Sequence, residues 1–229
     1  MVSIIDISDP NSFRSRLRKK RIKYLLGFME KVINAEKKKE ISICDIGGNY
    51  FYWSIFPFEK FPGITFNITL VNIEEYKIFK EVVIPNVNFS SLIADACNMN
   101  TIKDKQFDIA HSNSVIEHVG NWNRIKMMAN EVNRIAKYYF IQTPNYGFPV
   151  EPHYVLPFVH WLPRTMQTKV LMKVKHFDFD KATKGFEDNR MLTKKEFWYL
   201  FKGSDFIIER FYLFPKSLIA ASRIGSGGE

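Results

Sequence analysis

Two histidines, each close to a glutamate, are the residues best suited to acid–base chemistry. Glu117 directly precedes His118, and Glu151 stands two positions before His153 in a segment with several prolines. A carboxylate beside an imidazole can tune the imidazole into a general base. We therefore predict His153 as the first candidate base, paired with Glu151, and His118 as the second, with a loop-orienting role equally open for His118. These residues have no recognisable metal-ligand spacing, so the sequence leaves a metal site open but does not support one, and no metal ligand is assigned.

A glycine turn is the second feature with chemical potential. Residues 41–46 form a short apolar run with β-branched side chains, which favours a buried strand. The run ends in Gly47 and Gly48, and glycine lets a backbone approach a ligand closely. A turn of this kind can bind a phosphate or nucleoside, but many strand ends carry glycines only to reverse the chain. The surrounding motifs must decide between the two interpretations.

Length and composition indicate one domain. The 229 residues are 46% hydrophobic, which allows one sizeable core over residues 1–224, with a flexible tail at 225–229. Cys44 and Cys97 have no metal-like spacing and are interpreted as free thiols in a reducing compartment. No apolar run is long enough to span a bilayer. We therefore expect a soluble cytoplasmic protein.

The net charge of +9 is concentrated near the N-terminus. Most of the excess falls in residues 14–23 and 31–39, within one predicted amphipathic helix that begins after Ser12, a candidate N-cap. A charged helix face usually points to water, and we prefer that interpretation. The alternative is an anionic partner, such as a membrane surface, a nucleic acid or a phosphorylated substrate. No stable nucleic-acid complex is expected, and the sequence does not indicate an oligomeric state.

The predicted strands alternate with helical segments, which favours βαβ units and a parallel sheet. The five strands are expected at residues 41–46, 66–73, 87–94, 107–111 and 138–143. A short helix is expected at residues 74–83, and a long helix is expected within residues 114–137. Residues 144–190 break this pattern and are too long for a plain loop, so we interpret them as an insertion or lid. A capping box at Thr193 and Glu196 begins a further helix, and residues 206–213 and 218–222 are expected to form a closing antiparallel hairpin.

This order of elements resembles that of class I S-adenosylmethionine (SAM)-dependent methyltransferases, and several motifs support the resemblance. Residues 44–49 (CDIGGN) resemble the family's acidic residue and glycine loop, and residues 107–119 (FDIAHSNSVIEHV) resemble its fourth-strand motif. The resemblance implies a Rossmann-like, doubly wound, seven-stranded, mostly parallel sheet with an antiparallel last strand. It also implies SAM as cofactor. The residues expected at the cofactor are Asp45, Gly47, Gly48, Asn49, Asn72, Asp95, Ala96 and Asn113.

Individual positions in these motifs carry specific expectations. Asp45 is expected to orient the glycine loop through backbone N–H groups, and Asp95 and Ala96 to lie beside the adenine. Asn49 occupies a position where the family usually has glycine, and asparagine is the non-glycine residue that best tolerates the left-handed conformation. Asn72 replaces the usual ribose-binding carboxylate and can still accept one hydroxyl hydrogen bond.

The segment from Gln142 to Pro163 is similar to a QTPN..FP.EPH subset of methyltransferase type 11-like proteins, often associated with surface glycans or natural products. The resemblance implies O-methylation of a small-molecule or glycan acceptor, such as a surface polysaccharide precursor. We expect the acceptor between residues 117–122 and 146–161. The candidate acceptor-binding residues are Glu117, Trp122, Tyr146 and Tyr154.

Two other functions remain open. The positive charge is compatible with methylation of a nucleic acid. The departures in the glycine loop and at Asn72 are compatible with a non-catalytic SAM-binding partner subunit. The turn lacks the third glycine of GxGxxG, which disfavours a nicotinamide-dinucleotide enzyme.

Overall fold

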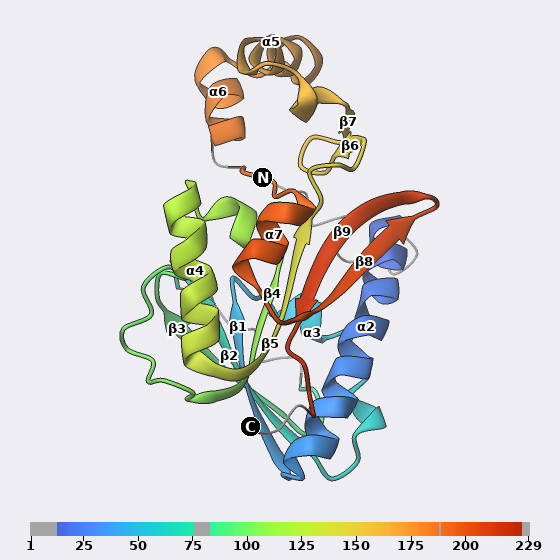
Figure 1. Ribbon diagram of the computed structural model, residues 1–229, viewed down its shortest axis with the longest axis vertical. Coiled ribbons are helices and arrows are strands. Elements are labelled where there is room, and N and C mark those ends of the chain that lie inside the picture. Colours follow the sequence, from blue (N-terminus) through green and yellow to red (C-terminus); the bar gives the residue numbers. More distant parts are fainter. Residues whose placement is uncertain (1–12, 76–82, 188, 226–229) are drawn as a thin grey trace.

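The computed structural model describes residues 13–75, 83–187 and 189–225, and it is built around a seven-stranded sheet (Figure 1). The strand order is β3-β2-β1-β4-β5-β9-β8. Strand β9 pairs antiparallel with both of its neighbours, and the other pairings in this sheet are parallel. The strands are β1 (Glu40–Ile46), β2 (Thr65–Asn72), β3 (Val87–Ile93), β4 (Phe107–Asn113), β5 (Ala136–Pro144), β8 (Asp205–Phe211) and β9 (Phe214–Ala221).

All seven expected strands are present within a few residues of their predicted bounds, and the fold class predicted from the sequence is confirmed. Helix α2 (Phe13–Glu36) is the predicted N-terminal helix. Its candidate cap, Ser12, lies outside the described residues, as do residues 76–82 of the helix expected at 74–83. The capping box of α7 (Lys194–Leu200) is present, because Thr193 and Glu196 exchange side-chain to backbone hydrogen bonds.

The expectation for Asn49 was wrong. Asn49 is extended (φ −141°, ψ 153°) and caps the short helix α3 (Tyr50–Trp53) by accepting a hydrogen bond from the Tyr52 backbone. An N-cap residue has this extended conformation, and asparagine is among the preferred N-caps. Gly47 alone supplies the positive φ in this turn (φ +65°). Asn49 therefore serves the helix start and not the reversal of the chain.

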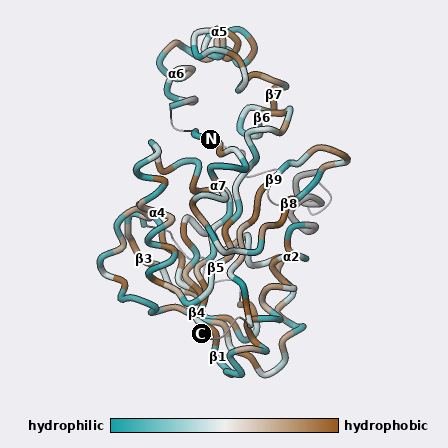
Figure 2. The backbone as a smooth tube through the Cα atoms, viewed as in Figure 1, coloured by the Kyte–Doolittle hydropathy of each residue, from teal (hydrophilic) through white to brown (hydrophobic). Residues whose placement is uncertain are grey.

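Two hydrophobic cores cover the two faces of the sheet. Helix α2 and the aromatic residues around α3 and the 3-10 helix η1 (Phe58–Lys60) pack on one face. Helices α4 (Trp122–Ile135) and α7 pack on the other face. Figure 2 shows hydrophobic residues running along the central strands between these layers. The central strands are buried on both faces, and successive side chains belong to different cores: Ile109 of β4 lies in one core and Ala110 in the other, as expected for a sheet covered on both sides.

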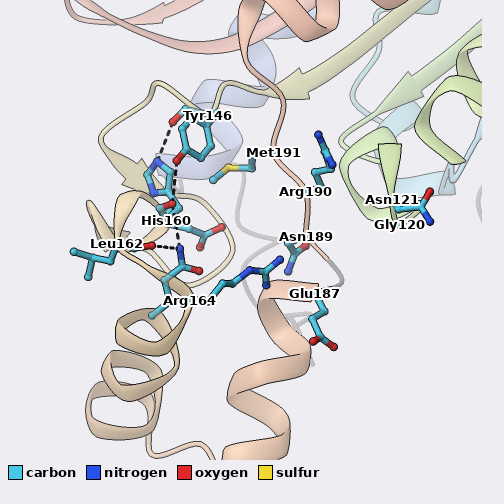
Figure 3. A pocket seen from close by; sticks show the side chains of 12 residues that line it. Gly120, Asn121, Tyr146, His160, Leu162, Arg164, Glu187, Asn189, Arg190 and Met191 are labelled. Atoms are coloured by element: carbon cyan, nitrogen blue, oxygen red, sulfur yellow. Dashed lines mark hydrogen bonds between the residues drawn. The ribbon is translucent and has the colours of Figure 1, made fainter. Parts of the chain in front are cut away.

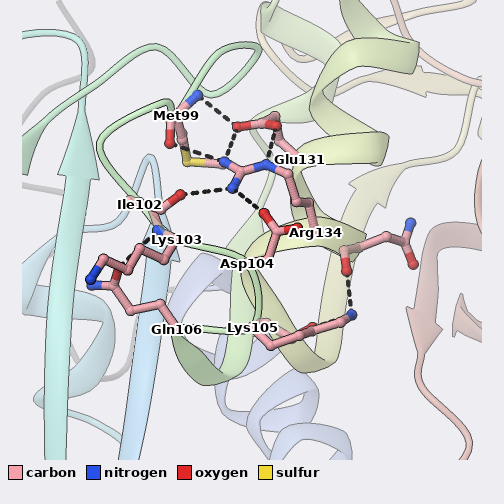
Figure 4. A network of polar contacts seen from close by, with 10 residues as sticks. Met99, Ile102, Lys103, Asp104, Lys105, Gln106, Glu131 and Arg134 are labelled. Atoms are coloured by element: carbon pink, nitrogen blue, oxygen red, sulfur yellow. Dashed lines mark hydrogen bonds and ion pairs between the residues drawn. The ribbon is translucent and has the colours of Figure 1, made fainter.

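The last turns of α4 are tied to the loop that leads into β4 (Figure 4). Arg134 donates hydrogen bonds to the carboxylates of Glu131 and Asp104 and to the backbone oxygens of Met99 and Ile102. Glu131 in turn accepts from the Met99 backbone at 2.7 Å. These contacts fix the loop between β3 and β4 without a crossover helix among its described residues.

The insertion expected at 144–190 forms a largely helical unit that stands beyond the carboxyl ends of the strands (Figure 1). A small core of Val159, Leu171 and Ala182 holds it together. Its elements are β6 (Val150–Glu151), β7 (Leu156–Pro157), η3 (Val159–Trp161), α5 (Arg164–Lys175) and α6 (Phe179–Glu187). Among the described residues, no helix has the length and hydrophobicity needed to cross a membrane.

Candidate active site

The sequence-predicted site residues gather at the carboxyl edge of the sheet. Strand β1 lies between β2 and β4, so the strand order reverses beside it. In open α/β sheets, ligands bind at the carboxyl ends of the strands where this reversal occurs. The glycine turn, Asn72 and Asp95 follow or end β1, β2 and β3, and the loop with Glu117 and His118 follows β4.

The glycine turn needs glycine at both positions. A Cβ on Gly47 would lie 2.5 Å from a methyl carbon of Val115, in addition to the strain of its positive φ. A Cβ on Gly48 would lie 1.9 Å from a carboxylate oxygen of Asp45. The Asn72 side-chain amide donates to the Gly48 carbonyl oxygen at 3.0 Å. Asn72 therefore positions the turn through its amide nitrogen, and its amide oxygen takes no part in this contact.

Asp45 is the centre of a buried cluster, here called the closed cluster, with His111 and Trp53. The carboxylate is 1% exposed, and one oxygen lies 2.6 Å from His111 Nδ1. Its other oxygen accepts a 2.7 Å hydrogen bond from Trp53 Nε1. The expectation that Asp45 orients the loop through backbone N–H groups is corrected accordingly: two ring nitrogens hold its oxygens. The Asp45 carboxylate supports the turn by packing against Gly48.

Asp95 forms an ion pair with Arg124 of α4. One guanidinium nitrogen contacts both carboxylate oxygens, at 3.0 and 2.8 Å, and the Cys97 backbone also donates to Asp95. The hydrogen bond from Arg124 holds the pKa of Asp95 below its ordinary value. The Asp95 side chain is 39% exposed, so it remains accessible to a ligand, whereas Ala96 beside it is buried.

Asn113 contacts an arginine from the N-terminal helix. Arg21 donates to the side-chain oxygens of Asn113 and Gln142, at 2.7 and 3.0 Å, and its Nε pairs with buried Glu209 at 3.1 Å. The Asn113 oxygen, expected at the cofactor, is thus occupied by Arg21. Nothing in the sequence distinguished Arg21 from its many basic neighbours, because a docked arginine and a solvated one have the same local pattern.

The two predicted histidine–glutamate pairs meet in space and form what we call the open cluster, made of Glu117, His118, Glu151 and His153. His153 Nδ1 lies 2.5 Å from Glu151 Oε1, and His153 Nε2 lies 3.3 Å from His118 Nε2. Glu117 Oε1 lies 3.9 Å from His118 Nε2. The structure therefore places Glu151 beside His153 and brings the two histidines together, and their role as a general-base site stays a prediction.

Glu117 is fully buried beneath these histidines. Thr143 donates to its Oε2 at 2.9 Å, whereas Oε1 has no hydrogen-bond partner. Burial raises the pKa of this carboxyl to about 7. Glu117 was predicted to contact the acceptor directly. This prediction is corrected, because Glu117 has no exposed surface and can act only through the histidines next to it.

A cavity of about 490 Å³ lies between the loop after β4 and the insertion (Figure 3). This is where the acceptor was predicted to enter. His160 donates from Nε2 to the Tyr146 carbonyl oxygen at 3.0 Å, and burial lowers the pKa of His160. The lining residues are Gly120, Asn121, Tyr146, Glu151, His160, Leu162, Arg164, Gln167, Glu187, Asn189, Arg190 and Met191.

Of the predicted acceptor-binding residues, Tyr146 lines this cavity and two others do not. Trp122 packs against Tyr199 and the Arg190 guanidinium. Tyr154 belongs to the small core of the insertion. Arg164, Arg190 and Asn189 line the cavity but were not predicted, because exposed basic and amide residues in an irregular segment carry no pattern that marks a binding site.

The sequence matches no protein-family profile and no curated protein. Among solved structures, the DszA carbon methyltransferase is similar over 94% of this chain and 56% of that chain, at 13% identity and a TM-score of 0.57. The CurJ carbon methyltransferase is similar over 91% of this chain and 54% of that chain, at 10% identity and a TM-score of 0.52. The chain thus spans just over half the length of these two proteins. Together with the strand order, these likenesses show that the chain has the Rossmann-like fold of the methyltransferases.

Proposed function

We propose that this protein is a SAM-dependent methyltransferase that methylates a hydroxyl oxygen of a small-molecule or glycan acceptor. The observation that carries the proposal is the placement of an imidazole–carboxylate cluster beside a 490 Å³ cavity, at the sheet edge that also bears the glycine turn. Two proteins with the same fold are named as carbon methyltransferases. We propose oxygen on the resemblance of residues 142–163, and the cluster offers the general base that a hydroxyl acceptor needs.

The residues at the cofactor edge fit SAM in kind and in order. Gly47 is the exposed glycine of the turn, the Asn72 amide oxygen can accept a hydrogen bond from a ribose hydroxyl, and the half-exposed Asp95 carboxylate can accept one from an amine. Phe51 is 43% exposed and offers an apolar ring next to the turn. SAM would supply a methyl carbon that the acceptor oxygen attacks, while the carbon–sulfur bond breaks and its electron pair stays on sulfur.

The proton of the acceptor hydroxyl would pass to His153. The Glu151 carboxylate accepts the hydrogen bond from Nδ1–H, which leaves the lone pair on Nε2. Glu151 also compensates the positive charge that His153 gains on protonation. The insertion contributes Tyr146 and His160 to the wall of the cavity beside this site.

We further propose that the acceptor is a glycan, which is more specific than methyl transfer alone. Its support is the similarity of residues 142–163 to the glycan-associated subset, and the mixed lining of the cavity with Tyr146, Arg164, Asn189 and Arg190. Planar guanidinium and amide groups bind hydroxyls and phosphates, and an aromatic ring can stack on a sugar. Sugar nucleotides of the cell envelope are the first acceptors to test.

The test separates binding from transfer. Calorimetry with SAM and with S-adenosylhomocysteine should show 1:1 binding of both, and the absence of binding would overturn the proposal. Isotope-labelled SAM should then transfer label to a sugar nucleotide or oligosaccharide. Label transfer to nucleic acid, with a steep salt dependence, would favour the nucleic-acid methyltransferase instead. Binding of SAM without transfer to any acceptor would favour the non-catalytic partner subunit.

A further inference from the structure

We propose that Glu117, His118 and His153 form a binding site for one divalent transition-metal ion, with Zn²⁺ as the representative ion. Each residue directs one potential ligand atom to the same small volume, and these three atoms lie within 4.8 Å of one another. The three residues come from two segments that are distant in the sequence, the loop after β4 and the insertion. The spacing in the sequence therefore did not reveal the site.

The protonation of His153 favours a ligand. Glu151 Oε1 lies 2.5 Å from His153 Nδ1, and a carboxylate at this distance holds the ring proton on Nδ1. The Nε2 atom of neutral His153 then carries a lone pair, and it faces His118 Nε2. A carboxylate on the far nitrogen of a metal-binding histidine is a common outer partner that fixes the ring and increases its basicity.

The separation of the two histidines matches two ligands on one ion. His153 Nε2 and His118 Nε2 are 3.3 Å apart, and the rings meet at 82°. Two nitrogens on a tetrahedral ion, each at about 2.0–2.1 Å, lie about 3.3–3.4 Å from each other. The Glu117 oxygen lies 3.9 Å from His118 Nε2 and within 4.8 Å of the ligand atom of His153, so it must move toward both histidines, by up to about 1.5 Å, to reach the same geometry.

Glu117 supplies the independent observation that points to a ligand. Its side chain has no exposed surface, and its Oε1 has no hydrogen-bond partner although Oε2 accepts from Thr143. A buried carboxylate oxygen without a partner costs free energy that a cation would offset. The orphan oxygen is the one nearest to His118, on the side of the two imidazoles.

Two nitrogens and one carboxylate oxygen select the kind of ion. Imidazole suits Zn²⁺ and the neighbouring first-row ions, whereas Mg²⁺ and Ca²⁺ prefer all-oxygen sites. Three protein ligands leave a coordination position open, which is the pattern of catalytic and not of structural zinc. Glu151 both holds His153 and lines the cavity, so the site lies at the cavity's edge. An ion there could lower the pKa of an acceptor hydroxyl or of a water.

The metal site does not depend on the proposed methyl transfer, because metal binding and SAM binding are measured separately. It does compete with one part of that proposal. The lone pair of His153 Nε2 can accept a proton or ligate an ion, but not both at once. Turnover before and after chelation therefore assigns proton removal to the imidazole or to the ion.

Metal binding is tested on the full chain after treatment with a chelator and buffer exchange. Titration with ZnCl₂ in a calorimeter should give one site per chain, and titration with MgCl₂ should give none. Co²⁺ should develop the visible absorption of a low-coordinate nitrogen–oxygen site, which Zn²⁺ then displaces. His118→Ala and His153→Ala should each weaken Zn²⁺ binding by at least about 100-fold, and Glu151→Gln by about 10–100-fold.

The control is His176→Ala, which removes an exposed histidine at the end of α5 and leaves the open cluster intact. It should bind Zn²⁺ as the unaltered protein does. Circular dichroism and thermal unfolding without metal establish that each variant is folded, and SAM binding gives a second check. The proposal is overturned if folded, metal-free protein binds no Zn²⁺, or if binding survives unchanged in both His118→Ala and His153→Ala.

Discussion

Two carboxylate–histidine clusters with buried carboxylates lie at the same edge of the sheet, and they differ in how completely their carboxylate oxygens are paired. In the closed cluster, both oxygens of Asp45 have ring-nitrogen partners, His111 and Trp53. In the open cluster, one oxygen of Glu117 has no partner. The residue types are alike, but only the open cluster adjoins the cavity, through Glu151.

This difference separates a structural role from a functional one. Buried polar groups in folded proteins are nearly always paired, so a satisfied cluster needs no ligand to explain it. The closed cluster fixes the glycine turn, because the Asp45 carboxylate occupies the space beside Gly48. An unsatisfied buried oxygen beside two imidazoles instead indicates a missing ligand or a reaction step. Loss of the closed cluster should therefore reduce stability, and loss of the open cluster should reduce activity.

The largest expected effect is on turnover, in the open cluster. His153→Ala should lower the rate of label transfer from SAM by about 10²–10⁴-fold, because it removes the general base or a metal ligand. SAM affinity should stay within a few-fold of the unaltered protein. The measurement is single-turnover transfer with saturating SAM, with His176→Ala as the control. An unchanged rate of label transfer by folded His153→Ala would contradict a functional role for the open cluster.

The next effect is on stability, in the closed cluster. Asp45→Ala should lower the free energy of unfolding by about 3–5 kcal/mol, because it leaves Trp53 Nε1 and His111 Nδ1 buried without a partner. Glu117→Gln should change the same free energy by about 1 kcal/mol or less, since it replaces a carboxylate that is only half satisfied. Urea denaturation of both variants measures the difference. Equal losses in the two variants would contradict the division of roles.

A smaller effect is expected at Asn72, at the end of β2. Asn72→Ala removes the hydrogen bond to the Gly48 carbonyl oxygen and should weaken SAM binding about tenfold, equivalent to one hydrogen bond of about 1.4 kcal/mol. Calorimetry measures the affinity. Asn88→Ala, which removes an exposed contact to Asn67 elsewhere on the sheet, is the control and should leave SAM affinity unchanged. Normal SAM affinity in Asn72→Ala would show that the position of the glycine turn does not affect SAM binding.

The sequence predicted the fold more completely than the site, for a physical reason. Strand periodicity and the Thr193 capping box are local patterns, and the structure has both. The meeting of His153 with His118 depends on how the insertion returns over the sheet, which no local pattern encodes. The same holds for Arg21, whose contact with Glu209 joins opposite ends of the chain. Asn49 shows a further limit, because N-cap and left-handed positions favour the same residue.

The smallest expected effect comes from Asp95 and Arg124, a pair at the same edge that is neither closed nor buried. Both side chains are about 40% exposed, so solvent screening limits their contribution to less than about 1 kcal/mol. The hydrogen bond from Arg124 lowers the pKa of folded Asp95, so the stabilisation is present above the unfolded-state pKa and is lost as pH falls through the folded-state pKa. Arg124→Met should therefore be slightly less stable than the unaltered protein at neutral pH, and the difference should vanish in acid. Urea denaturation across this pH range, with NMR titration of Asp95, measures both quantities. A loss as large as that of Asp45→Ala would mean that exposure does not separate this pair from the closed cluster.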